Sequence, residues 1–473
     1  MNERMWTEFL ILMKQELALA VILFLLLIIK LGKERSNESY LNIVNVLLLL
    51  NLIVGFLWNR EGVLFNEMFR TNQLMVLEKN ILNLGMLIIS LQSWSWLKDH
   101  KHAPEFYMLL LSTMIGMFFM ISGGNLLMFY LGLELSTIPL AAAANFDLTK
   151  RRSSEAAMKL IFSSAFASAL LLFGISMIYG ATGTLVFSEL PQHISGAPLQ
   201  VFAFILVLAG FAFKISAVPF HLWTADVYEG APIAVTSFLS VISKAAVLFV
   251  FVSVLYTVFK PIAEAWYNML FVLSLVTIFI GNLFAIRQNN FKRFLAFSSI
   301  AQVGFILVGI SGSSQAGAAS VVYFVLIYVF SNLAAFGVVS VVSAATGKES
   351  ISDYKGFYKT NPVLSWVLTI ALFSLAGVPP TAGFFGKYFL LFAGAAKGNY
   401  LLIVLAALSL MISFYYYLRI VKVMFMDSNP EPVEKISIPV MPRLALYACI
   451  IGVIAVGFIG WIYSYIHSLS AGL

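Results

Sequence analysis

The sequence FKISAVPFHLWTADVYEGAP, Phe213–Pro232, places a lysine, two prolines, a histidine and two carboxylates in the middle of a very apolar chain. Proline lacks a backbone N–H and its ring clashes with the preceding helical turn, so Pro219 predicts a break over residues 217–220. Lys214 lies about one turn before that break, and His221 lies directly after it. A broken membrane helix exposes polar backbone, which is tolerated only around a cavity or within protein. The stretch therefore predicts an interrupted helix at a polar site inside a membrane.

The composition of the whole chain supports a membrane location. Of 473 residues, 61% are hydrophobic and 11% are charged, whereas a soluble domain carries about 25% charged residues. The single cysteine, Cys449, excludes a disulfide framework and a cysteine-based metal cluster. The first residues read as a retained helix, because acids interrupt the basic region that a signal peptide requires. The net charge of +7 has a topological role in such a chain and does not indicate nucleic-acid binding.

Charged and Gly/Pro/Asn-rich breaks divide the chain into candidate spans. A bilayer-spanning helix needs about 20 largely apolar residues, and this rule predicts about 14 spans. Their approximate cores are 10–31, 41–58, 74–96, 106–122, 124–145, 157–180, 201–224, 231–257, 264–286, 294–312, 319–345, 363–394, 401–426 and 441–467.

The twelfth span repeats the pattern of the seventh. In SLAGVPPTAGFFGKYFL, Pro379 and Pro380 lie at the centre and Lys387 follows them. Two proline-interrupted spans that are five spans apart indicate an internal repeat, and an odd separation makes the two copies cross the membrane in opposite directions. We therefore expect an all-α polytopic protein with inverted five-helix repeats in spans 4–8 and 9–13. The expected units are residues 1–105 with three helices, 106–257, 264–426, and a C-terminal helix in 441–473.

Lysine and arginine predict the orientation. Eighteen basic residues flank or lie in the loops after odd-numbered spans, and seven, Lys79 among them, are assigned to the other side. The positive-inside rule then makes the odd-numbered loops cytoplasmic and puts both termini on the outer side.

Four lysines remain inside apolar spans: Lys159, Lys214, Lys244 and Lys387. Glu134 is the one acid that clearly joins them. A charge at bilayer depth costs at least ~2.5–3.5 kcal/mol, so such residues normally face protein or a wet cavity and mark ion or proton routes. A structural ion pair is the alternative for Glu134 and one lysine, but one acid cannot neutralise four lysines.

Burial favours the neutral amine of a lysine, and an approaching carboxylate favours the ammonium. A buried lysine near a movable acid is therefore a site that can load and release a proton. His221 suits a proton relay, or else it is a histidine bonded to a backbone carbonyl. Asp226 and Glu229 are expected to act as helix-cap or interhelix partners near the cytoplasmic end.

Five segments carry a resemblance to a known family. They are GLELSTIPL, FKISAVPFHLWTADVYEGAP, SFLSVISKAA, RFLAFSSIAQVGF and LAGVPPTAGFFGKYFL. Together they resemble the antiporter-like membrane subunits of proton-pumping NADH:quinone oxidoreductase, respiratory complex I, and among these the subunit N group that includes mitochondrial subunit 2. The resemblance covers nearly the whole chain. It implies a family fold of 14 helices with inverted five-helix repeats.

The resemblance also implies roles for individual residues. Glu134 is similar to the glutamate of the family's fifth span, and Lys214, Lys244 and Lys387 are similar to the lysines of spans 7, 8 and 12. Lys159 resembles an additional lysine in span 6. The implied mechanism is a relay: a proton is held at Lys214 while Glu134 is close, and separation of that pair passes it through Lys244 and water to Lys387.

The resemblance further implies partners and cofactors. The expected neighbours are the antiporter-like chain M and the small chains K and J, in a bacterial inner membrane. NADH, FMN, Fe–S clusters and quinone are expected in partner subunits and none in this chain, whose sequence has no GxGxxG turn or CxxC cluster. Alternatives are a subunit of a multisubunit Na⁺/H⁺ antiporter, which shares the glutamate–lysine core, and a structural spacer that moves no ions.

Overall fold

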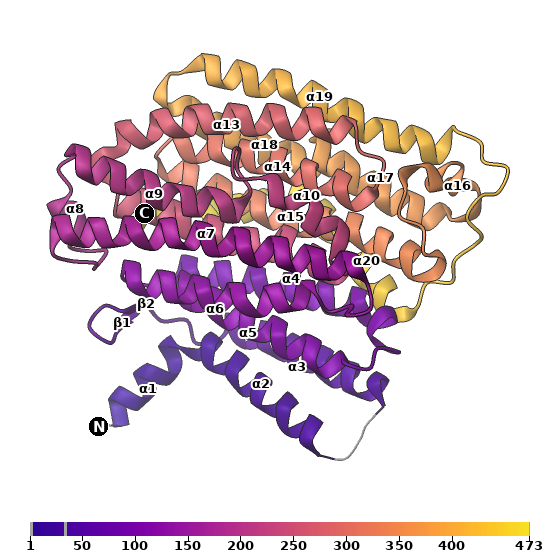
Figure 1. Ribbon diagram of the computed structural model, residues 1–473, viewed down its shortest axis with the longest axis horizontal. Helices are drawn as coiled ribbons and strands as arrows, with labels where there is room; N and C mark the ends of the chain where they lie inside the picture. The colour runs from indigo at the N-terminus through magenta and orange to yellow at the C-terminus, as the bar shows by residue number, and fades with distance from the viewer. Residues whose placement is uncertain (1–2, 33–35, 473) are drawn as a thin grey trace.

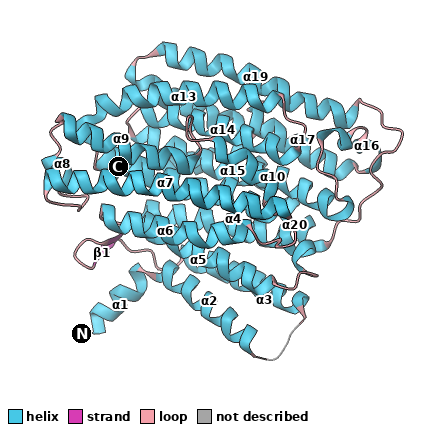
Figure 2. Ribbon diagram, viewed as in Figure 1, coloured by secondary structure: helices cyan, strands magenta, loops and turns pink. Residues whose placement is uncertain are grey.

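The computed structural model describes residues 3–32 and 36–472, and they form a bundle of helices. Figure 1 shows most of these helices running side by side along one direction, and Figure 2 shows that most loops gather at the two ends of the bundle. One antiparallel hairpin, β1 (Gly62–Leu64) and β2 (Phe69–Thr71), lies in the loop after the second long helix. The prediction of an all-α polytopic fold is confirmed.

The first half of the bundle begins with α1 (Glu3–Leu12), α2 (Lys14–Leu31), α3 (Asn37–Phe56) and α4 (Gln73–Leu97). It continues with α5 (Ala103–Ile121), α6 (Leu126–Ala144), α7 (Arg151–Thr182), α8 (Leu190–His193), α9 (Pro198–Ile215), α10 (Leu222–Gly230), α11 (Ile233–Phe238) and α12 (Lys244–Thr257). A π-helical turn, Leu239–Ser243, joins α11 to α12.

The second half comprises α13 (Ala263–Ile286), α14 (Phe291–Ser311), α15 (Gln315–Thr346), α16 (Phe357–Thr360), α17 (Pro362–Ala376) and α18 (Ala382–Gly394). It ends with α19 (Tyr400–Phe425), α20 (Val440–Phe458) and α21 (Gly460–Leu469). In Figure 1 the pair α9–α10 runs from left to right, whereas α17–α18 runs from right to left.

Twelve helices in the described ranges are long and apolar enough to cross a membrane, or thirteen if α1 and α2 are counted as one span. The chain bends by 81° between these two helices, so the continuous first span expected over 10–31 is divided near Met13. The short helix α17 is also apolar. A count of fourteen needs α17 and α18 to be the halves of one span, and it stays a prediction.

Contacts between loops support the predicted alternation of the two ends. Phe69, after α3, bridges to Gly123, after α5, and Asn125 bridges to Val186, after α7. At the opposite end Asn290, after α13, bridges to Ser350, after α15. Loops after even-numbered spans therefore meet one another, as do loops after odd-numbered spans.

One candidate relay residue, Lys244, lies on the most buried helices of the bundle. The α14 helix is buried along nearly its whole length, and so is most of the segment 233–257. These helices contain Ser299, Gln302 and Lys244, whereas α7, α13 and α19 expose more of their apolar surface. Polar groups in the centre of the bundle are thus shielded from lipid by the outer helices.

Glycines bring two helix pairs into backbone contact. A Cβ atom on Gly116 of α5 would lie 2.5 Å from the backbone nitrogen of Ser136 in α6. A Cβ atom on Gly281 of α13 would lie 2.6 Å from the backbone nitrogen of Ala301 in α14. Neither neighbour is a flexible side chain, so these positions have no room for a methyl group.

We predict that Gly116→Ala lowers the thermal stability of the protein in detergent. Overpacking of this kind costs ~1–3 kcal/mol, and the α5–α6 backbones would have to separate. Gly180→Ala is the matched control, because Gly180 lies in α7 and has no atom within 4 Å of its added Cβ. Equal melting temperatures for the two variants would show that the α5–α6 contact does not limit stability.

Candidate proton-translocation site

Two helix interruptions form the centre of the candidate site. The α9 helix ends at Ile215, and Ser216 adopts a left-handed conformation with φ 65°. The α17 helix ends at Ala376, and Gly377 does the same with φ 86°. The interruptions predicted from the prolines are therefore present in both spans, and each leaves backbone carbonyl groups at a helix end without helical partners.

Lys214 lies in the last turn of α9, where it contacts hydroxyl groups. Its Nζ atom donates to Thr137 Oγ1 at 2.6 Å and to Ser164 Oγ at 2.8 Å. Glu134 on α6 accepts a hydrogen bond from Ser168 of α7. Ser164 and Ser168 are one helical turn apart, so the same face of α7 contacts both charged residues. In the described part of the chain no ion pair joins Glu134 to Lys214.

Lys244 begins α12, directly after the π-helical turn. Its side chain is 3% exposed, and Nζ donates to Ser299 Oγ at 2.8 Å. The Tyr228 ring lies 5.5 Å from Nζ. A cavity of about 10 Å³ adjoins Lys244, Ser299 and Gln302. Among the described residues, all partners of Lys244 are therefore neutral.

Lys387 of α18 reaches back to the interruption of its own span. Its Nζ atom donates to the carbonyl oxygens of Leu375 at 2.7 Å and Ala376 at 3.1 Å. The ring of Phe305 lies 4.9 Å from Nζ. Because α17 ends at Ala376, both carbonyls are available, and no carboxylate in the described ranges pairs with Lys387.

Lys159 is located differently from the other three lysines. Its Nζ atom contacts Glu155 and Asp226 at 2.7 Å each, and its side chain is 41% exposed. Lys159 lies in the third turn of α7, which faces the acidic side of α10, so it is ion-paired near the end of its span. Its role in a relay stays a prediction. Asp226 and Glu229 also pair with Arg293 at 2.7 and 2.9 Å, as expected of interhelix partners.

His221 lies in the interruption between α9 and α10 and is 8% exposed. Its Nδ1 atom is buried without a hydrogen-bond partner in the described part of the chain. No hydrogen bond connects His221 to Lys214, so its role in a relay stays a prediction.

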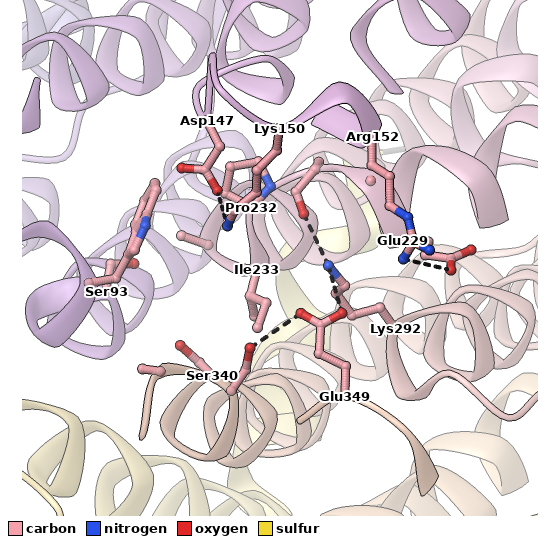
Figure 3. Close-up of a pocket in the computed structure, with 16 residues that line it drawn as sticks. Ser93, Asp147, Lys150, Arg152, Glu229, Pro232, Ile233, Lys292, Ser340 and Glu349 are labelled. Carbon is pink, nitrogen blue, oxygen red and sulfur yellow. Dashed lines mark hydrogen bonds and ion pairs between the residues drawn. The ribbon is translucent and has the colours of Figure 1, made fainter. Parts of the chain in front are cut away.

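A larger pocket lies at the end of the bundle that holds the odd-numbered loops. Figure 3 shows it between the α6–α7 loop, the α10–α11 junction and the ends of α14 and α15. Its volume is about 330 Å³. The charged residues that line it are Asp147, Lys150, Arg152, Glu229, Lys292 and Glu349. Lys292 Nζ lies 3.3 Å from Glu349 Oε2. The pocket lining thus contains equal numbers of acidic and basic side chains.

The chain resembles complex I subunits in both sequence and structure. Residues 123–413 match the NADH:quinone oxidoreductase/Mrp antiporter transmembrane family. NADH-quinone oxidoreductase subunit N of Phocaeicola vulgatus is 44% identical over 455 residues, which cover 95% of this chain and 96% of that protein. The chain belongs to the NADH-quinone oxidoreductase subunit N family. The sequence-based assignment to complex I is therefore confirmed.

Solved structures agree with this assignment at the level of the fold. A chain of respiratory complex I from Thermus thermophilus with bound aureothin is 28% identical, with a TM-score of 0.79 and coverage of 94% of this chain and 97% of that chain. A chain of the Mrp complex from Dietzia sp. is 19% identical, with a TM-score of 0.82 and coverage of 98% and 96%. The second likeness shows the fold alone, so sequence identity separates the subunit N family from the antiporter alternative.

Sequence reasoning missed a second group of buried charges. Lys79 was assigned to an outer loop, but it lies inside α4 at 1% exposure and contacts Glu16 Oε1 at 2.5 Å. Ser122 Oγ accepts from the same Nζ atom at 2.6 Å. Glu78, also on α4, is 6% exposed. Hydropathy alone could not reveal this pair, because Glu16 and Lys79 lie near the ends of two apolar segments that meet only in the folded bundle.

We predict that Lys79→Met destabilises the protein more than the double variant Glu16→Gln/Lys79→Met does. Removal of one partner leaves a buried charge uncompensated, which typically costs ~3–5 kcal/mol, whereas removal of both avoids that penalty. Melting temperatures of the three proteins in detergent test this. A double variant no more stable than Lys79→Met would contradict the ion-pair explanation.

Proposed function

We propose that the chain carries protons through a line of residues formed by Glu134, Lys214, Lys244 and Lys387, driven by quinone reduction elsewhere in complex I. The observation that carries this proposal is the setting of Lys244 and Lys387. Both are almost fully buried, and their ammonium groups contact hydroxyl or carbonyl oxygens rather than carboxylates. Such a lysine can gain or lose a proton without breaking an ion pair.

Glu134 supplies the control of Lys214 in this proposal. The carboxylate and the ammonium contact Ser168 and Ser164 on the same face of α7, so a small movement of α6 relative to α7 would change their separation. An approaching carboxylate favours the charged lysine, and its withdrawal favours the neutral amine. Proton release toward Lys244 follows from the withdrawal.

The two halves of the bundle form inverted repeats in this proposal, over residues 106–257 and 264–426. Three features support it: the matching left-handed residues Ser216 and Gly377, the close glycine contacts of α5–α6 and α13–α14, and the opposite directions of the interrupted pairs in Figure 1. Each half then supplies one half-channel, with Lys214 in the first and Lys387 in the second. Lys159 belongs to the ion-pair cluster beside the entry. In the sequence His221 lies between Lys214 and Asp226, which is a member of that cluster.

The proposal assigns redox chemistry to partner subunits, which would hold NADH, FMN, Fe–S clusters and quinone. Chains M, K and J are the proposed neighbours in a bacterial inner membrane. The pocket of Figure 3 is the proposed cytoplasmic entry, because charged groups surround it at the end rich in basic loops. Both chain termini would then lie on the outer side.

We predict that Lys387→Met and Lys387→Arg both lower the number of protons translocated per NADH oxidised. Methionine cannot bind a proton, and arginine remains charged in practice, so neither can alternate between two states. The measurement is proton uptake by vesicles that contain equal amounts of assembled complex. Full translocation by Lys387→Arg alongside loss in Lys387→Met would make Lys387 a fixed charge and not a carrier.

The orientation has its own test. An impermeant maleimide applied to intact cells should label Ser468→Cys near the C-terminus and leave Arg151→Cys unlabelled, because the first position is outside and the second is cytoplasmic. Both side chains are exposed, and the native Cys449 is buried. Permeabilised cells, in which both positions should react, provide the control. The reverse labelling pattern would invert the topology.

A further inference from the structure

Gln302 lies between Lys244 and Lys387, on the almost fully buried α14 helix. It is 1% exposed, and its Nε2 atom donates to the carbonyl oxygen of Leu375 at 2.8 Å and to Tyr417 Oη at 3.1 Å. The Leu375 carbonyl also accepts the hydrogen bond from Lys387 Nζ. One oxygen, freed by the end of α17, therefore joins the Gln302 amide to Lys387.

The other side of Gln302 adjoins Lys244. Gln302, Ser299 and Lys244 line the same cavity, whose volume of about 10 Å³ suits roughly one water molecule. Ser299 lies three residues before Gln302 on α14 and accepts from Lys244 Nζ. Lys244 and Gln302 thus border the same cavity, and Gln302 and Lys387 donate to the same carbonyl oxygen, that of Leu375.

The amide oxygen of Gln302 has an open hydrogen-bonding capacity. Oε1 is buried and has no partner in the described part of the chain. A buried acceptor without a partner costs ~1–3 kcal/mol. The adjoining cavity is lined mainly by apolar side chains, but Lys244, Ser299 and Tyr328 bring polar groups to it, and a water held there would offset this cost. Tyr417, itself bonded to Ser298 of α14, restrains the amide from the side of α19. The Gln302 amide nitrogen thus donates to both Leu375 and Tyr417, and its oxygen is free to accept.

We propose that Gln302 is a positioning residue that orders a water-mediated hydrogen-bonded connection between Lys244 and Lys387. This inference rests on the proposed function of the two lysines. The amide keeps both of its hydrogens throughout, so the proton moves through the ordered water and the lysine amines. Gln302 contributes by aligning that water and by sharing the Leu375 carbonyl, which links its position to that of Lys387.

Gln302→Met tests the proposal, because methionine has a similar length but cannot hold either hydrogen bond. In assembled complex it should lower the number of protons translocated per NADH. Gln302→His keeps a donor and an acceptor, so it should recover part of the translocation. Because imidazole titrates near neutral pH, the pH profile of translocation over pH 5–8 should differ between the His variant and the wild type. A purely structural role for Gln302 would not produce that difference.

Gln92→Met is the matched control. Gln92 of α4 is also buried, and its Nε2 atom donates to the carbonyl oxygen of Leu333 at 2.8 Å, in another part of the bundle. Translocation should be unchanged in this variant. Equal losses in Gln92→Met and Gln302→Met would mean that any buried glutamine matters for packing, and would overturn the inference.

Lys387→Met separates this inference from the proposed function. If Lys387→Met is impaired while Gln302→Met translocates normally at equal assembly, the inference fails and the relay through Lys387 stands. If Lys387→Met translocates normally, the proposed function fails and this inference fails with it. A Gln302→His variant without recovery or a changed pH profile would also contradict the positioning role.

Discussion

The hydrogen bonds from Lys387 to the carbonyl groups of Leu375 and Ala376 illustrate the constraint on which this bundle depends. An ammonium group inside a membrane must be solvated by the protein, because lipid supplies no acceptors. In a continuous helix, the backbone carbonyl groups accept hydrogen bonds from N–H groups of the same helix. Interruption of the span releases two of them, and the lysine of the next half-helix binds there. The helix break and the buried lysine thus explain each other.

The structure holds its buried and half-buried lysines in two ways. Lys79 and Lys159 are paired with carboxylates, Lys79 in the dry contact between α2 and α4 and Lys159 near the surface. In the described chain the hydrogen bonds of Lys214, Lys244 and Lys387 go only to hydroxyl and carbonyl oxygens. An ion pair stabilises the charged form of both partners, whereas neutral acceptors hold the ammonium less firmly. This difference separates structural lysines from those suited to proton transfer.

Close helix packing shields the buried polar groups of the bundle from lipid. Glycines allow α5 to meet α6 and α13 to meet α14 at backbone distance, and the outer helices enclose α14. Along α14, Ser299 accepts from Lys244, and Gln302 donates to the Leu375 carbonyl that also binds Lys387. A proton route needs such fixed polar groups, because mobile lipid-facing side chains could not maintain their alignment.

The sequence by itself determined the membrane class, the helical architecture, both interruptions and three lysines inside the bundle. Each of these follows from local chemistry: apolar length sets a span, and proline removes a hydrogen bond wherever the chain places it. The family assignment followed from the same segments. The tertiary structure alone decided which partners each charge has. Glu16 meets Lys79 across 63 positions of sequence and Lys159 meets Asp226 across 67, and Gln302 meets Leu375 across 73. Hydropathy carries no information about such pairings, because they depend on how helices rotate and pack against one another.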